Sequence, residues 1–419
     1  MRKILLILLF LSSLNLYAAV FEANSGTAHQ VYRHEPAKTS GLQDVFVFYD
    51  LSQASVRFEC EQPQACVWTK NGESLTQEQV SIEGNASVLS ALQTDVIYTV
   101  QYDSQGFSFY VIDYQNNALN YGTLAAVTDA EDIASSLQLS LKYCSEDIAY
   151  KGLDGKKYEI AREHTLTYVD AVWNENDESF EDEEKVITRE GFVSSFVVDA
   201  PKQDVEFVLQ GDQFMRFWNL PLAETRCAYE AVSIETHAKA VKVKDEEEGL
   251  SLKGSAPLEV EFYSLANPAT EYCIWYIYTT PGATGDYLYR KEENISYTFY
   301  SSGTYTVKLI AGNDVCSDSV EFSITVTESS LDCPNFFTPR STPGENDEFR
   351  VAYESLVEFH GRILNRWGNL LFEWTDPELG WDGTYKGNPV SPGVYFYVIT
   401  ATGSDGIKYV KRGDVNLLE

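Results

Sequence analysis

Short apolar runs separated by turn residues are the feature that most restricts how this chain can fold. Residues 45–49, 96–100 and 107–112 are apolar stretches of about five residues, and turn sequences such as Lys70-Asn-Gly-Glu73 lie between such stretches. Apolar side chains at helical spacing are scarce, whereas aromatic residues, including 27 tyrosines, make up 13% of the chain. The pattern predicts an all-β protein made of tandem immunoglobulin-like sandwiches in a multi-domain array.

The length of 419 residues exceeds what one ordinary core supports and indicates three or four domains of about 100 residues each. We expect an immunoglobulin-like domain at 19–135, a second β-sandwich at 136–245, a third domain at 246–328 and a C-terminal domain at 333–419. The first two domains share no repeat strong enough to indicate a duplication.

The first 18 residues are expected to be a signal peptide, because two basic residues precede an apolar run that ends in small residues. Cleavage after Ala18 would make Leu16 the third residue before the cleaved bond, whereas cleavage after Ala19 would put the bulkier Tyr17 at that position. We therefore expect cleavage after Ala18. No later stretch reaches the roughly 20 apolar residues that a membrane span needs. We therefore predict export into or through the periplasm, without a transmembrane span.

A net charge of −32 and a pI near 4.4 restrict the partners of this chain. Binding to phosphate groups needs clustered lysines and arginines. Nucleic acids and anionic lipid surfaces are therefore not expected as partners, and solubility at a surface explains the charge.

The chain contains two acidic runs, of which the first is a candidate for a calcium site. Seven carboxylates lie between Asn174 and Glu184, and Asp245-Glu-Glu-Glu248 forms the second run. A calcium loop alternates its carboxylates and has a glycine at its sharp turn, and the first run does neither. This favours a solvated hairpin tip for the first run and a linker for the second. We expect that the protein binds no cofactor. Calcium is the one cofactor for which the sequence offers a candidate site.

The last segment is predicted to be a small antiparallel sandwich. Its apolar strands are expected at 359–364, 370–374, 394–401 and 408–418, with turns of Gly, Pro, Asn and Asp between them. Five motifs follow one another here: Pro334-Asn-Phe-Phe-Thr-Pro339, Asn346-Asp-Glu-Phe349, Asn365-Arg-Trp-Gly368, Gly380-Trp-Asp-Gly383 and Ser391-Pro-Gly-Val-Tyr395.

Together these motifs resemble the gliding-motility-associated, type B sorting domain, which the type IX secretion system recognises in the proteins that it exports. The resemblance implies that this machinery is a partner, with an outer-membrane barrel protein as a further candidate. It also implies that the chain reaches the cell surface or the extracellular space. The motif residues that form the candidate site are Asn346, Asp347, Phe349, Asn365, Arg366, Trp367, Gly368, Trp381, Asp382, Gly383, Pro392, Gly393, Tyr395 and Tyr397.

One departure from the family concerns residues 340–344, Arg-Ser-Thr-Pro-Gly, where the family usually has Asn-Gly-Asp-Gly. A carboxylate is missing there, so we expect a turn at Asp347 rather than a bound calcium ion.

The strand at 394–401 is apolar on both faces. Alternation places Val394, Phe396 and Val398 on one face and Tyr395, Tyr397 and Ile399 on the other. We predict that the face with Tyr395 and Tyr397 docks onto the export machinery or an outer-membrane partner.

The third domain resembles a PKD domain. The resemblance rests on the Ala256-Pro-Leu entry, the central Trp275 and Ser302-Gly-Thr-Tyr-Thr-Val307. Thr279-Thr-Pro-Gly282 stands where the family usually has a Gly-Asp-Gly turn. The resemblance implies a spacer or a module that contacts carbohydrate or protein.

Seven cysteines in an exported chain are expected to form disulfides. The pairs suggested by position are Cys60 with Cys66, Cys144 with Cys227, and Cys273 with Cys316. Buried free thiols are the alternative. Cys333 is left over, as a free thiol, an intermolecular link or a displaced partner of one of these pairs.

The sequence indicates no catalytic, cofactor-binding or metal-binding residue. Five histidines are scattered, and no metalloprotease, serine-hydrolase, phosphate-loop or paired-cysteine motif is present. Our expectation is a non-catalytic surface or secreted protein for adhesion, with an unknown surface glycan or protein as its ligand. The alternatives are a hydrolase of surface polysaccharide with its activity in residues 41–240, and a structural component of the gliding or secretion apparatus.

Overall fold

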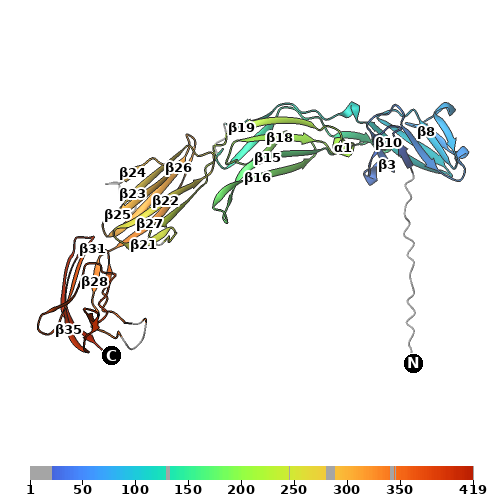
Figure 1. Ribbon diagram of the computed structural model, residues 1–419. Helices are drawn as coiled ribbons and strands as arrows, with labels where there is room; N and C mark the ends of the chain where they lie inside the picture. The colour runs from blue at the N-terminus through green and yellow to red at the C-terminus, as the bar shows by residue number, and fades with distance from the viewer. Residues whose placement is uncertain are drawn as a thin grey trace, which may run out of the picture. The chain divides into compact units, whose positions relative to one another are not determined.

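The computed structural model describes residues 21–128, 133–244, 246–279, 288–339, 344 and 346–418, and Figure 1 shows that their regular secondary structure is almost entirely β-strand. The all-β fold class of tandem sandwiches is therefore confirmed. The signal peptide predicted at 1–18 lies outside the described residues. Within the described ranges, no helix has the length and apolar character needed to cross a membrane.

The chain divides into two compact units. The first comprises the described parts of Met1–Asp170, Glu183–Asp199 and Val205–Tyr229, and the second those of Ala171–Asp182, Ala200–Asp204 and Glu230–Glu419.

The first sandwich consists of a four-stranded and a six-stranded sheet. The smaller sheet has the order β1 (Phe21–Asn24), β4 (Ser55–Glu59), β8 (Ala86–Ser90), β7 (Val80–Glu83). The larger has the order β2 (Tyr32–His34), β3 (Asp44–Phe48), β10 (Gln105–Asp113), β9 (Val96–Tyr102), β5 (Val67–Lys70), β6 (Glu73–Ser74). Short 3-10 helices lie at η1 (Lys38–Ser40), η2 (Pro63–Ala65), η3 (Gln77–Gln79) and η4 (Gln115–Asn117). Between the sheets, Phe21, Trp68 and Phe109 form an aromatic core.

The second sandwich begins earlier than we expected. One sheet has the order β11 (Leu124–Val127), β12 (Ser136–Leu141), β17 (Ser195–Asp199), and the other β16 (Ser179–Glu190), β15 (Glu163–Asn174), β18 (Val205–Gly211), β19 (Ala223–Tyr229). Because β11 pairs with β12, it belongs to this sandwich, although we assigned residues up to 135 to the first domain.

The first two sandwiches share a hydrophobic core. Strand β3 is buried along its whole length because its two faces are covered by different layers. Phe46 and Phe48 face the core of the first sandwich, whereas Val45 and Val47 face the hairpin of β13 (Ile148–Lys151) and β14 (Lys157–Ile160) and the helix α1 (Gln213–Phe217). The shared core comprises Leu42, Val45, Val47, Tyr110, Ile112 and Tyr114 from the first sandwich, and Ile148, Tyr150, Ile160, Phe214 and Trp218 from the second.

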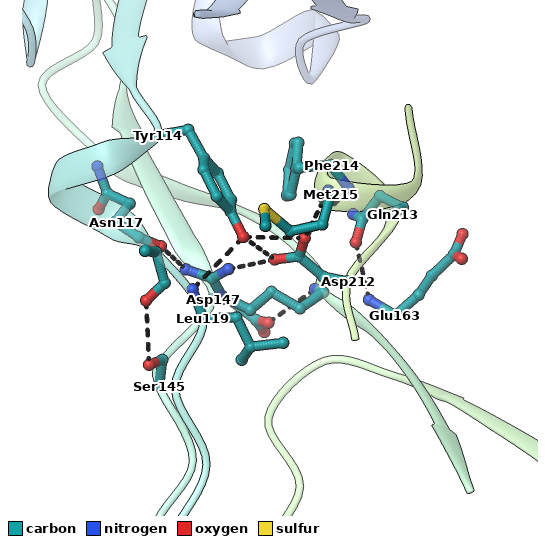
Figure 2. A network of polar contacts seen from close by, with 12 residues as sticks. Tyr114, Asn117, Leu119, Ser145, Asp147, Glu163, Asp212, Gln213, Phe214 and Met215 are labelled. Carbon is teal, nitrogen blue, oxygen red and sulfur yellow. Dashed lines mark hydrogen bonds and ion pairs between the residues drawn. The ribbon is translucent and has the colours of Figure 1, made fainter. Parts of the chain in front are cut away.

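A buried ion pair lies beside this shared core (Figure 2). The side chains of Arg162 and Asp212 are 2% and 0% exposed, and Arg162 Nη1 donates a hydrogen bond to Asp212. Asp212 also accepts bonds from the Tyr114 hydroxyl, at 3.1 Å, and from the backbone amides of Phe214 and Met215, each at 3.2 Å. It is thereby the N-cap of α1.

The rest of the Arg162 guanidinium is also paired, because its Nε donates to the carbonyl of Glu146 at 2.8 Å and its Nη2 to that of Asn117. Burial, and after it the charge of Asp212, raises the pKa of Tyr114, so its hydroxyl stays a donor. A buried charge with these partners is tolerated because its hydrogen-bonding groups are satisfied.

The acidic hairpin of β15 and β16 has a turn between Asn174 and Ser179. Asn174 Nδ2 donates to Asp177 at 2.8 Å and to Glu181 at 3.1 Å. Strand β16 lies at the edge of its sheet, and its side chains, among them Glu181–Glu184, are exposed or half-buried.

The third sandwich also begins earlier than expected. One sheet has the order β20 (Thr236–Lys242), β22 (Leu258–Ala266), β25 (Asn294–Phe299), and the other β21 (Ser251–Ser255), β27 (Ser317–Thr327), β26 (Gly303–Gly312), β23 (Tyr272–Tyr278), β24 (Leu288–Arg290). Strand β20 pairs with β22, although we assigned residues up to 245 to the second domain. Trp275 lies fully buried in the core, as expected of a central tryptophan. The PKD assignment stays a prediction, and residues 280–282 of its atypical turn lie outside the described ranges.

The C-terminal sandwich contains all four of the strands that we predicted there. Its main sheet has the order β29 (Phe336–Phe337), β36 (Lys408–Leu417), β35 (Gly393–Gly403), β31 (Leu356–Leu364), β32 (Leu370–Trp374). Two small pairs accompany it: β28 (Ser330–Asp332) with β30 (Ala352–Glu354), and β33 (Thr384–Tyr385) with β34 (Asn388–Pro389).

We predict that Arg162→Met lowers the free energy of unfolding of the protein by about 3–5 kcal/mol, because it leaves Asp212 buried without its cation. The exposed pair of Arg216 with Glu163 provides the control, and Arg216→Met is expected to cost less than about 1 kcal/mol. Urea unfolding with hydrogen exchange read at α1 measures both. Equal costs for the two variants would contradict the prediction.

Candidate functional site in the C-terminal domain

Two of the motif aromatics form the centre of the C-terminal core. Phe349 and Trp381 are both 0% exposed, and their backbones exchange hydrogen bonds of 2.9 and 3.1 Å. The indole of Trp381 donates to the carbonyl of Thr384 at 2.8 Å. Tyr397 packs on Phe349 with ring centroids 5.2 Å apart, and Tyr395 packs on Trp381 at 5.0 Å. These four residues hold the loop segments against the main sheet.

A second group of motif residues shapes turns. Asp382 Oδ1 accepts from the Thr384 amide at 2.9 Å and from its hydroxyl at 2.8 Å. Gly383 has φ +77°, and a Cβ there would lie 2.9 Å from a methyl group of Leu417, so glycine is required on both counts. Gly393 follows the exposed Pro392 with φ +149°, at the start of β35.

The turn between β31 and β32 is built by Asn365 and Gly368. Asn365 Oδ1 accepts from the amides of Trp367 at 3.0 Å and Asn369 at 2.9 Å, and Gly368 has φ +82°. The side chain of Trp367 is 76% exposed and the Arg366 guanidinium lies 5.1 Å from its ring centroid. The turn therefore fixes the backbone and leaves the indole in solvent.

Asp347 also serves a turn. Its Oδ2 accepts from the Gly344 amide at 2.6 Å, and the carbonyl of Asn346 accepts from the Thr338 amide at 2.8 Å. Residues 340–343, where the family carboxylate is missing, lie outside the described ranges. In the parts of the chain that the structure describes, no group of three or more His, Cys, Asp and Glu side chains is arranged to hold a metal.

The prediction that Tyr395 and Tyr397 form an open docking face is wrong. Both rings are half-buried against the core, and the Tyr395 hydroxyl donates to the carbonyl of Ser391 at 2.6 Å. Burial raises the pKa of both phenols. The opposite face, with Val394 and Phe396, is exposed instead. Because both faces of this strand are apolar, the sequence could not decide which face the loops cover.

The cysteines of the described chain are free thiols. The sulfur atoms of Cys60 and Cys66 lie 3.3 Å apart on either side of η2. Cys144 lies in the core of the second sandwich, and Cys227 packs against that core from β19. Cys273 contacts the hydroxyl of Ser264, whereas Cys316 contacts the carbonyl of Val232. Burial raises the pKa of the Cys333 thiol. The three pairings stay predictions, and the geometry favours the first.

The histidines are placed apart from one another and serve as packing or pairing groups. His164 is buried and bonds the Tyr121 hydroxyl at 2.7 Å, and His237 stacks on Trp173 with centroids 3.8 Å apart. His360 pairs with Glu373 at 2.7 Å. These contacts do not join a histidine to a serine, threonine or cysteine side chain.

Sequence reasoning missed the Arg162–Asp212 pair, because two charged residues 50 positions apart leave no local pattern. It also missed the exposure of Trp367, although Asn and Gly on either side of it did indicate a turn.

The two motif tryptophans are predicted to respond differently to truncation. Trp381→Ala is expected to lower the free energy of unfolding by about 3–5 kcal/mol, because it opens a cavity in the core. Trp367→Ala is expected to change it by no more than about 0.5 kcal/mol. Denaturant unfolding, with limited proteolysis of the C-terminal domain, tests both. A loss of protease resistance in Trp367→Ala would contradict the assignment of an exposed indole.

We predict that Cys60 and Cys66 form a disulfide in the exported protein. The two thiols would give two electrons and two protons to a disulfide oxidant such as oxidised glutathione. Closing so short a loop is expected to stabilise the sandwich by about 2 kcal/mol. Peptide mapping without reduction should yield a linked Cys60–Cys66 peptide that reduction separates. Complete alkylation of both thiols before reduction would rule the disulfide out.

Comparisons with known proteins agree with this architecture. Residues 126–226 match the fibronectin type III domain family, and residues 331–417 match the CHU_C type IX secretion signal domain family. The first match spans the second sandwich, with its start close to β11. No curated protein matches the chain significantly in sequence.

Among solved structures, the tetra-tandem repeat in the extending region of a large adhesion protein has a TM-score of 0.25 and 10% identity, covering 89% of this chain and 98% of that one. The FN1–FN3 domains of chicken CNTN1 have a TM-score of 0.26 and 10% identity, covering 72% and 99%. A Ca2+-stabilized adhesin that helps an Antarctic bacterium bind ice has a TM-score of 0.22 and 12% identity, covering 93% and 99%.

Similarities at these TM-scores carry no argument about function. The two family matches do carry one, because they coincide with sheets that the chain forms. The chain therefore has a fibronectin type III domain at 126–226 and a type IX secretion signal domain at 331–417, and it is a protein exported to the cell surface or the extracellular space.

Proposed function

We propose that this protein is a non-catalytic adhesion or ligand-binding protein, and that the type IX secretion system delivers it by its C-terminal domain. The match of residues 331–417 to the secretion signal domain is the observation that carries the proposal. It accounts for the destination of the chain, and the sandwiches that precede the signal supply the surface that is delivered.

The first two sandwiches support a binding role. Their shared core and the buried Arg162–Asp212 pair hold the two sandwiches together. A ligand site on a preorganised surface binds without the loss of conformational entropy that ordering a mobile site would require. Fibronectin type III and immunoglobulin-like domains are generally non-catalytic, and function must be argued from the site rather than the fold.

A cavity of about 430 Å³ at the open side of the first sandwich is the best candidate for a ligand. Phe21, Val31 and Phe46 contribute apolar surface, and Arg33 and Arg57 contribute charge. Because its lining exposes more polar than apolar surface, the cavity fits a polar ligand better than an apolar one.

The carboxylates of this cavity do not favour the hydrolase alternative. Glu59 is 3.1 Å and Glu22 3.8 Å from the guanidinium of Arg57, so both are engaged by one cation. Glycoside hydrolysis requires one carboxyl group to serve as an acid and the other as a base or nucleophile. Two carboxylates that share one arginine do not have these different environments.

Deletion of residues 331–419 should abolish surface delivery in a cell that has a type IX secretion system. Immunofluorescence and protease shaving of intact cells measure delivery, and the truncated chain is expected to accumulate in the periplasm. Undiminished delivery of the truncated chain would refute the proposal.

The binding role is tested with the secreted full-length chain on glycan and protein arrays. A specific ligand that Arg57→Ala binds at least about tenfold more weakly would support the cavity. Release of reducing sugar from a polysaccharide would instead establish the hydrolase. Stable co-purification with an outer-membrane barrel after surface delivery would establish a component of the apparatus.

A further inference from the structure

An exposed apolar patch lies on the outward face of the main sheet of the signal domain. We define the outer patch as Leu364, Trp367, Leu370, Val394 and Phe396. Leu364 on β31 pairs directly with Phe396 on β35 and with Leu370 on β32, so these three side chains form a row across the sheet. Val394 lies two residues before Phe396 on the same face, and the Trp367 turn joins the two strands at this end of the row.

Four of the five members of the outer patch are exposed, and the fifth, Leu364, is half-buried. Trp367 is 76% exposed, and Leu370, Val394 and Phe396 are between 43% and 49% exposed. Single exposed apolar residues are ordinary, whereas a continuous group on one face indicates an interaction site.

Trp367 is the motif aromatic that folding does not explain. Phe349, Trp381, Tyr395 and Tyr397 pack in or against the core, whereas the turn of Trp367 is held by Asn365 and Gly368. Within the described residues, its ring contacts the Arg366 guanidinium and no other aromatic or charged group. Most of its surface is therefore available to a partner outside this domain.

The rim of the outer patch carries two arginines that form no ion pair with the described residues. Arg362 is paired with Glu373 at 2.8 Å, but Arg366 and Arg412 form no ion pair with any described residue. Arg412 lies across from Val398 on β36, and Asp414 is the one carboxylate that pairs in register with the row, opposite Phe396. Two free arginines in a chain of net charge −32 favour a partner with carboxylates.

We propose that the outer patch is the surface by which the signal domain docks onto a protein of the type IX secretion machinery. The matching surface on that protein is an apolar groove that receives Trp367 and Phe396, with carboxylates at its edge for Arg366 and Arg412. Tryptophan and arginine are the residue types that most often dominate protein interfaces. The inference rests on the proposed export through this domain, and it adds the face that is recognised.

A protein groove fits these observations better than a membrane does. Anionic headgroups attract clusters of basic residues, and they repel a chain with this excess of carboxylates. A second copy of this chain would bring the same unpaired arginines together across the interface.

The test is the double variant Trp367→Glu with Phe396→Glu in the full-length chain, expressed in cells that secrete it. The matched control is Val357→Glu with Leu379→Glu, which also changes one exposed strand residue and one exposed loop residue of the domain, at the end of β31 remote from Leu364 and in the loop after β32. We expect the double variant to reach the surface at least about tenfold less than the wild type and to accumulate in the periplasm with a protease-resistant C-terminal domain. The control is expected to be delivered normally.

Normal delivery of the double variant, or equal retention of the control, would overturn the proposal. Deletion of residues 331–419 in parallel separates the two hypotheses: if the deletion blocks delivery and the double variant does not, export through the domain stands and the outer patch is wrong. If the double variant loses protease resistance, Trp367→Ala takes its place, since the side chain bears none of the hydrogen bonds of the turn.

A photo-crosslinking amino acid at position 367 identifies the occupant. A cross-link to an outer-membrane secretion protein, absent when the same group is placed at position 357, would support the proposal. Cross-links only to a second copy of the chain, or only to lipid, would overturn it.

Discussion

The contact on which the arrangement of the first unit depends is the buried pair of Arg162 and Asp212. An unpaired charge in this position would be strongly destabilising, so each partner requires the other. The pair also draws in segments that are distant in sequence: Tyr114 follows β10 of the first sandwich, and Asp212 begins α1 of the second. Trp218 adds a further tie, because its indole donates to the carbonyl of Gln30 at 2.7 Å. The two sandwiches are thus joined by specific polar contacts as well as by apolar area.

The strand content of this chain was predictable because it is local. Apolar runs between turn residues marked β31, β32, β35 and β36 to within a few residues. The domain boundaries were not predictable in the same way, because the sheet to which a strand belongs is decided by its pairing. In the sequence, β11 looks like the last strand of the first domain and β20 like the last strand of the second. By their pairing, β11 is the first strand of the second sandwich and β20 the first strand of the third.

One signal of the shared core was present in the sequence. Val45-Phe-Val-Phe48 is apolar at every position, which is typical of a strand covered on both sides. The same reasoning gave the wrong result at β35, where the tyrosines face the core and Phe396 faces solvent. Apolar alternation shows that two faces exist, and only the path of the loops decides which is covered. Within the candidate site, the family motif supplied the candidate residues, but their division into core, turn and exposed groups required coordinates.

The acidic strand β16 has a consequence for the protein at high local density. It is a long edge strand with free backbone groups, and such edges are templates for pairing with another chain. Carboxylates at Glu181, Asp182, Glu183 and Glu184 would face one another if two copies joined edge to edge, and their repulsion opposes that union. The run of charge that raised the question of calcium therefore disfavours edge-to-edge pairing of two copies through β16.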